Sequence, residues 1–175
     1  MIEISERWLA EFKEQFLERL VFDLLYEEVR RLFGEAAARQ LIFKTMKEAA
    51  KFASREMKYK NSCELLTLPF KAFNIKASCK ASEGHITLTV SECPLLKYDS
   101  SKIGKPCVVM TAFLAGLIET LINKKVLVET PRVLFGNLKA EVRVALLESL
   151  ATGHNRCLFV IKGLSKGEAS ESSRN

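Results

Sequence analysis

Residues 107–122 limit most strongly how this chain can fold, because they are almost entirely apolar. The longest apolar stretch, residues 107–118, is interrupted only by Thr111 and Gly116 and ends at Glu119. A helix that is apolar on every side is usually buried inside a protein. The run is shorter than the roughly 20 apolar residues that a membrane span needs. We therefore expect a buried helix that the rest of the chain must cover.

The residues before this segment have the periodicity of two amphipathic helices. Between residues 5 and 33, apolar side chains recur at spacings of three and four, and charged residues fill the gaps. Gly34 is the expected stop, since glycine tolerates the left-handed backbone at a helix end. A second helix is expected over 35–58. Its inner face is predicted to consist of Ala38, Leu41, Ile42, Thr45, Met46, Ala49, Phe52 and Ala53.

Elsewhere the period of the pattern changes to two, which is typical of strands. A short strand is expected over 64–70, and a hairpin over 73–81 and 85–92 around Gly84. After the buried helix, strands are expected over 126–129, 132–135, 138–144, 147–151 and 157–162. The Gly136-Asn137 pair and the turn at 152–155 are predicted to make these an antiparallel meander.

This order of elements favours an α+β fold, because it lacks a regular alternation of strands and helices. The expected architecture is N-terminal helices, a β-hairpin, one buried helix and C-terminal antiparallel strands. Residues 1–34 are predicted to be a helical extension, 35–162 the folded domain and 163–175 a disordered tail rich in Ser, Gly, Glu and Lys.

Composition and motifs argue against several functions. The net charge is +6, but the basic residues are scattered rather than grouped, so direct nucleic-acid binding is not expected. The acidic N-terminus does not resemble a signal peptide, which favours a cytoplasmic location. Neither type of glycine-rich phosphate loop occurs, and there is no Gly-x-Ser-x-Gly motif. Non-catalytic binding is therefore favoured over catalysis.

The chain has five cysteines with no Cys-x-x-Cys pair, and in a reducing compartment most are expected to be buried thiols. Three of them lie at the ends of predicted elements, namely Cys93, Cys107 and Cys157. Thiols in such positions can converge on a zinc ion. Both interpretations, buried thiols and metal ligands, remain open from the pattern alone.

Apolar side chains of the buried helix and of the following strands are the candidate ligand-binding residues. They are Val109, Phe113, Leu117, Phe135 and Phe159. If space remains between them, they would form a site for a small apolar molecule. If they pack tightly, they are simply core.

Several strings together resemble the 4-vinyl reductase, or hydrocarbon-binding, domain family. They are Glu92-Cys93-Pro94, Gly104-Lys105-Pro106-Cys107, Ala115-Gly116-Leu117, the stretch 33–37, and the run from Ser149 through Gly153-His154 to Cys157 and Phe159. The resemblance spans roughly residues 32–161. It implies an α+β fold shared with TRAPP-type tethering subunits and haem nitric-oxide-binding domains.

The resemblance also implies a function. Members of this family bind small, mostly apolar molecules, some sense aromatic compounds for transcription regulators, and dimers are common. In phenol-sensing members, cysteines near the buried helix and the last hairpin hold zinc. Cys107 and Cys157 match two of those positions, whereas Ser149 replaces the second hairpin cysteine. Haem is not expected, because neither His85 nor His154 is on a predicted helix.

The leading hypothesis is a ligand-binding or sensor domain for a small hydrophobic molecule, paired as a homodimer through its N-terminal helix. One alternative is a cysteine- or zinc-dependent enzyme, related to thiazoline-carboxylate hydrolases or to pigment vinyl reduction. Another is a protein-interaction subunit.

Overall fold

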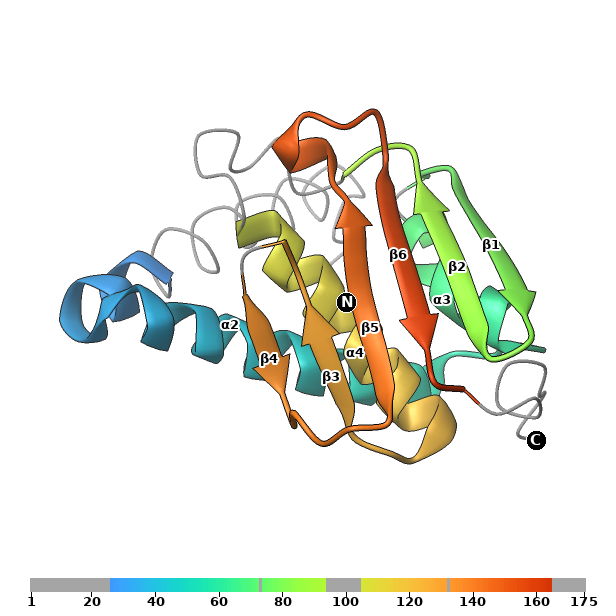
Figure 1. Ribbon diagram of the computed structural model, residues 1–175, viewed down its shortest axis with the longest axis horizontal. Coiled ribbons are helices and arrows are strands. Elements are labelled where there is room, and N and C mark those ends of the chain that lie inside the picture. The colour runs from blue at the N-terminus through green and yellow to red at the C-terminus, as the bar shows by residue number, and fades with distance from the viewer. Residues whose placement is uncertain (1–25, 73, 94–104, 132, 165–175) are drawn as a thin grey trace, which may run out of the picture.

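The computed structural model describes residues 26–72, 74–93, 105–131 and 133–164 (Figure 1). Its helices are α2 (Glu27–Glu56), α3 (Ser62–Ala72), α4 (Lys105–Ile122) and the short 3-10 helix η2 (Leu150–Thr152). Its strands are β1 (Ala77–Ser82), β2 (His85–Val90), β3 (Val126–Glu129), β4 (Leu134–Gly136), β5 (Val142–Glu148) and β6 (Cys157–Lys162).

The strands form one six-stranded sheet in the order β1-β2-β6-β5-β3-β4. Helices α2, α3 and α4 lie on one face of this sheet (Figure 1). The predicted α+β class is confirmed, as is the hairpin of β1 and β2. The strand predicted over 147–151 is wrong: β5 ends at Glu148 and η2 follows, and it is β5 that pairs antiparallel with β6.

The sheet is mixed, because β3 and β5 pair in parallel. The predicted hairpin between residues 132–135 and 138–144 is therefore wrong: β4 pairs with β3, placing Phe135 opposite Val128. The chain makes a turn after Gly136, in which Ala140 N–H donates to Asn137 O at 2.9 Å. This turn connects β4 to β5, but the two strands are not paired, because β3 lies between them in the sheet. Strand β3 is buried over Val126, Leu127 and Val128.

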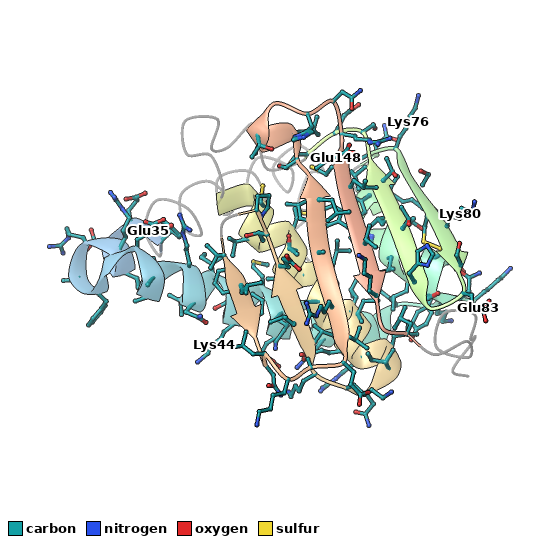
Figure 2. All side chains as sticks on the ribbon, in the orientation of Figure 1. Glu35, Lys44, Lys76, Lys80, Glu83 and Glu148 are labelled. Atoms are coloured by element: carbon teal, nitrogen blue, oxygen red, sulfur yellow. A yellow bond between two sulfur atoms is a disulfide. The ribbon has the colours of Figure 1, made fainter. Side chains whose placement is uncertain are left out.

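Gly34 interrupts α2, as the sequence predicts. Its φ of 85° and ψ of 170° leave the helical region, and a residue without a Cβ adopts such a φ at little cost. The helix that follows ends at Glu56. The part of α2 around Glu35 projects beyond the edge of the sheet (Figure 2). The proposed boundaries at residues 34 and 162 stay predictions, and residues 1–25 and 165–175 lie outside the described part of the chain.

The inner face of α2 differs from the prediction. Ala38, Ile42 and Met46 do face the core, but Phe43 and Ala50 take the places given to Thr45 and Ala49. Leu41 and Phe52 are exposed, by 37% and 69%. Periodicity predicts one apolar face of the helix. The apolar residues of α2 spread beyond one face, and packing buries only some of them.

The strand predicted over residues 64–70 is also wrong, because these residues belong to α3. The backbone N–H of Glu64 donates to Asn61 Oδ1 at 2.9 Å, and Glu64 Oε2 accepts from the N–H of Lys60 at 2.6 Å. This reciprocal pair is close to a capping box, which starts a helix. Leu65, Leu66 and Phe70 are all buried; Leu66 and Phe70 are four positions apart and so lie on the same helix face.

Two of the five cysteines form a disulfide. Cys63 of α3 is bonded to Cys79 of β1, with Cα atoms 5.4 Å apart. For this pair the expectation of free thiols is wrong, because α3 packs directly on β1 and brings the two residues together.

Helix α4 is the centre of the core, as its composition predicts. Ala112, Leu114, Ala115, Leu117 and Ile118 are 0% exposed. Gly116 lets α4 approach α2 closely, because a Cβ there would lie 2.3 Å from the carbonyl oxygen of Lys47 and 2.7 Å from Ala50 Cβ. None of the helices in the described part of the chain combines the length and the apolar content that spanning a bilayer requires.

Candidate functional site

The five predicted ligand-binding residues come together in one hydrophobic cluster. Val109 and Leu117 of α4, Phe135 of β4 and Phe159 of β6 are buried, and Phe113 is half-buried against the same cluster. The sequence therefore identifies side chains that share one interior region, and their role in binding stays a prediction.

Phe135 also makes a contact that periodicity did not predict. Its ring stacks on Phe43 of α2, with ring centroids 4.8 Å apart and an angle of 12° between the planes. This contact joins α2 to the edge strand of the sheet. Phe43 is thus a further member of the cluster, missed because the predicted inner face of α2 was rotated.

Two of the three predicted metal-binding cysteines are near neighbours through one serine. Cys107 Sγ, at the start of α4, lies 3.0 Å from Ser149 Oγ, which follows β5. Ser149 is fully buried and also accepts a hydrogen bond from Ala151 N–H at 3.1 Å. Cys157, the first residue of β6, contacts Ser149 and the backbone of Leu150. Cys93 is half-buried just beyond the end of β2.

These side chains do not fit a zinc ion as they stand. A structural zinc takes four ligands, mostly cysteine and histidine, whereas this cluster offers two thiols and one hydroxyl. No three His, Cys, Asp or Glu side chains gather into a metal site within the described residues. A metal held by Cys93, Cys107 and Cys157 stays a prediction from the sequence.

The same thiols lack the features of a catalytic nucleophile. Both Cys107 and Cys157 are buried. Burial raises the pKa of the Cys157 thiol above its usual value, and this outweighs the hydrogen bonds that would lower it. A reactive cysteine needs the opposite, a lowered pKa with some exposure.

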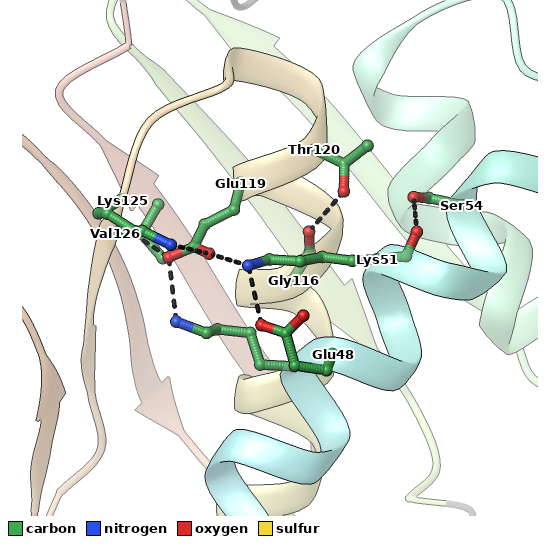
Figure 3. Close-up of polar contacts among 9 residues, drawn as sticks. Glu48, Lys51, Ser54, Gly116, Glu119, Thr120, Lys125 and Val126 are labelled. Carbon is green, nitrogen blue, oxygen red and sulfur yellow. Dashed lines mark hydrogen bonds and ion pairs between the residues drawn. The ribbon is translucent and has the colours of Figure 1, made fainter.

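A buried ion cluster lies near the C-terminal end of α4, and sequence reasoning missed it. The Glu119 side chain is only 4% exposed, and its Oε1 accepts hydrogen bonds from Lys47 Nζ and from Val126 N–H, each at 3.1 Å (Figure 3). Its Oε2 forms an ion pair with Lys51 Nζ at 2.8 Å. The cluster thus joins α2, α4 and the start of β3.

The charges in this cluster stabilise one another. Burial alone would raise the pKa of Glu119, but the contacts from Lys51, Val126 N–H and Lys47 outweigh it and hold the pKa below its usual value. Burial alone would lower the pKa of Lys51, yet Glu119 and Glu48 raise it overall. Both groups are charged near neutral pH. The sequence signal for this cluster was a single acid inside an otherwise apolar helix.

A pocket of about 370 Å³ opens beside this cluster. It lies where the last turn of α2 meets the end of α4. Its lining residues are Lys51, Arg55, Glu119, Thr120, Asn123, Lys124 and Lys125. None of the five predicted ligand-binding residues lines it, so this basic pocket is distinct from the apolar cluster.

Comparison with known proteins gives one informative result. No family model matches the sequence, and no curated protein matches it. Membership of the 4-vinyl reductase family therefore stays a prediction.

A solved structure has a similar fold: the crystal structure of the phenol-responsive sensory domain of the transcription activator PoxR with phenol. The TM-score is 0.51, the sequence identity is 11%, and the match covers 96% of this chain and 80% of that one. The chain shares the fold of this sensory domain. At such low identity the likeness shows the fold alone.

Proposed function

We propose that this protein is a non-catalytic ligand-binding or sensor domain that takes a small hydrophobic molecule between α4 and the sheet. The observation that carries the proposal is the fold shared with the PoxR sensory domain, whose crystal structure was solved with phenol. The apolar cluster around Leu117 and Phe159 supplies side chains of the required chemistry.

The enzyme alternative has less support, because the thiols of Cys107 and Cys157 are buried and burial raises the pKa of Cys157. The interior also offers few polar groups to orient a reaction: the buried polar residues of α4 are Thr111 and Glu119. Thr111 donates its hydroxyl hydrogen to the Cys107 carbonyl of its own helix, and Glu119 is held by lysines. These groups serve the fold.

Methyl NMR tests the proposal directly, with phenol as the probe. The methyl resonances of Val109 and Leu117 are expected to shift in a saturable way on titration. The methyl groups of Leu138, which is 70% exposed, and Leu147, which is 51% exposed, serve as internal controls. Shifts of equal size at all four residues, or at none of the buried ones, would contradict an interior site for an aromatic ligand.

A cavity-filling variant gives a second, independent readout. Val109→Phe adds volume to the cluster and is expected to abolish the saturable shift at Leu117. Leu147→Phe adds volume to an exposed position of β5 and should leave binding unchanged. If Val109→Phe does not fold, Phe159→Leu enlarges the same region, and it is expected to change the affinity for phenol.

The N-terminal helix predicted as the dimer contact lies mostly outside the described residues, and we further propose that two copies pair through a surface that includes α2. Four of the seven exposed large apolar side chains among the described residues lie on this helix, including Phe33 and Phe52, which are 72% and 69% exposed. Light scattering is expected to give the mass of a dimer. Phe52→Glu should produce monomers, whereas Leu138→Glu, at an equally exposed position outside α2, should not. A monomeric parent protein at micromolar concentration would refute the pairing.

A further inference from the structure

The disulfide between Cys63 and Cys79 lies at the edge of the fold. Strand β1, which carries Cys79, is an edge strand and pairs only with β2 among the described strands (Figure 1). Cys63 and Cys79 are both half-buried, whereas the free thiols of Cys107 and Cys157 are buried. The open edge of β1 therefore gives a second molecule a route to this bond that does not cross the core.

The bond is not the only restraint on α3. The helix packs on β1, β2 and α4, and its side chains Leu65, Leu66 and Phe70 are buried. Beyond its C-terminal end, the N–H of Ile75 donates to the carbonyl of Phe70 at 2.9 Å, just before β1 begins. These contacts do not depend on the disulfide, and burial of the apolar side chains favours the packed position of the helix. Breaking the bond should therefore leave the body of α3 in place.

The disulfide adds a restraint on the first turn of α3. Asn61 caps this turn, because its Oδ1 accepts from the N–H of Glu64 at 2.9 Å and its carbonyl accepts from the N–H of Leu65 at 3.1 Å. Cys63 lies within the same turn, and its bond closes a ring that runs from residue 63 to residue 79. Closing such a ring removes conformational freedom from the chain. Opening it should loosen the first turn while the rest of the helix stays packed.

The position of Cys63 also favours one direction of exchange. A thiolate released there would lie at the N-terminus of an 11-residue helix, where the helix dipole stabilises negative charge. An attacking thiolate should therefore displace Cys63 rather than Cys79, since the more stable thiolate leaves faster. Cys157 does not supply the attacking group, because its strand β6 is separated from β1 by β2. Exchange thus calls for a thiol from a second molecule.

We propose that the Cys63–Cys79 bond is a reversible thiol–disulfide exchange site whose reductant is a dithiol, and that its reduction releases the first turn of α3. One thiolate of the dithiol bonds to Cys79 Sγ, the bond between the two cysteines breaks, and Cys63 Sγ leaves with the electron pair and takes up a proton. The second thiol of the dithiol then loses its proton and bonds to the first, which releases Cys79 Sγ to take up another proton. The protein gains two electrons and two protons, and the dithiol becomes a disulfide. This redox role does not require a hydrophobic ligand.

The rate of reduction by dithiothreitol tests exchange in the folded state. The full chain is reduced in native buffer, and new thiols are alkylated and located by mass spectrometry. Direct attack predicts a rate that doubles with dithiothreitol concentration and changes less than about twofold in urea below the unfolding transition. A rate that rises steeply with urea would show that unfolding must come first, and would overturn the proposal. Oxidised glutathione should restore the Cys63–Cys79 bond, and a different pairing would also overturn it.

Amide hydrogen exchange tests whether the effect of reduction is local. Reduction is expected to speed exchange at the N–H groups of Glu64 and Leu65 at least about tenfold, and to change exchange at Ile75 less than about twofold. The variant Cys63→Ser/Cys79→Ser should exchange like the reduced parent protein with or without dithiothreitol, whereas Cys93→Ser should keep the full response.

Two outcomes of the exchange experiment would overturn the proposal. Unchanged exchange at Glu64 and Leu65 would show that the bond does not restrain the first turn of α3. Loss of protection throughout α4 would show that the bond is needed for the whole fold and is not a local exchange site. If Cys63→Ser/Cys79→Ser does not fold, the oxidised and reduced forms of the parent protein supply the same comparison.

Discussion

Lys47 of α2 and Glu119 of α4 are 72 positions apart in the sequence, yet the lysine Nζ lies 3.1 Å from the carboxylate Oε1. Their side chains are 14% and 4% exposed. Lys47 Nζ also lies 5.3 Å from the centroid of the Phe43 ring. The contact therefore connects the two central helices at a point almost closed to water.

Glu119→Gln is expected to destabilise the fold by about 3 kcal/mol, because it leaves the buried Lys47 without its counter-charge and Lys51 with only the exposed carboxylate of Glu48. Urea unfolding followed by circular dichroism measures the change. Glu48→Gln is the matched control: its carboxylate is 67% exposed and contacts the same Lys51, so its loss should cost less than about 0.5 kcal/mol. Equal effects of the two variants would show that burial of the cluster contributes nothing.

Acid should remove the contribution of Glu119. The pKa of this carboxyl is lower in the fold than in the unfolded chain. Its stabilisation is therefore complete above the unfolded pKa, near 4.5, and is lost as the pH falls through the folded value. The difference in unfolding free energy between the parent protein and Glu119→Gln should be constant near neutral pH and shrink below pH about 4.5. A difference that stays constant into acid would contradict the lowered pKa.

Gly116→Ala is expected to force α2 and α4 apart. Alanine is the better helix former by about 1 kcal/mol, but the added Cβ would lie 2.3 Å from a backbone oxygen of α2, which cannot move alone. Overpacking of this kind costs about 1–3 kcal/mol, so a net loss of stability is expected. Thr120→Ala, one turn further along α4, removes only a hydroxyl bonded to its own helix and should have a smaller effect. Thermal unfolding of both variants checks the ranking.

The sequence predicts the elements of this fold better than their partners. The composition of residues 107–122 is enough to bury α4, and the alternation in residues 85–90 is enough to define β2. The pairing of β3 with β5 depends on which strand fills the gap between them, and local turn signals at Gly136 do not contain that information. The helix over 62–72 was missed because the apolar residues in 64–70 were interpreted as a short strand, although Asn61 and Glu64 form a helix cap.

The two candidate sites also differ in how far the sequence predicts them. The apolar cluster follows from hydrophobicity, which a sequence displays directly. The basic pocket combines Lys51 and Arg55 with residues 120–125, which only the crossing of α2 and α4 brings together. A lone Glu119 in an apolar helix was the one available sign, since a buried charge requires a partner from elsewhere in the fold.

Ser149→Cys is expected to convert the thiol pair into a metal site. Ser149 Oγ lies 3.0 Å from Cys107 Sγ and contacts Cys157, so a third sulfur there would join two that are already in place. Three thiolates bind zinc or cadmium far better than two thiols and a hydroxyl. Cadmium titration, followed by the absorption of the new thiolate–metal bonds, should saturate at one ion per chain. Adding Cys107→Ser to this variant should abolish the signal, and Ser54→Cys, which places a thiol on α2, should not produce it. A parent protein that binds cadmium as tightly as Ser149→Cys would show instead that the existing side chains already suffice.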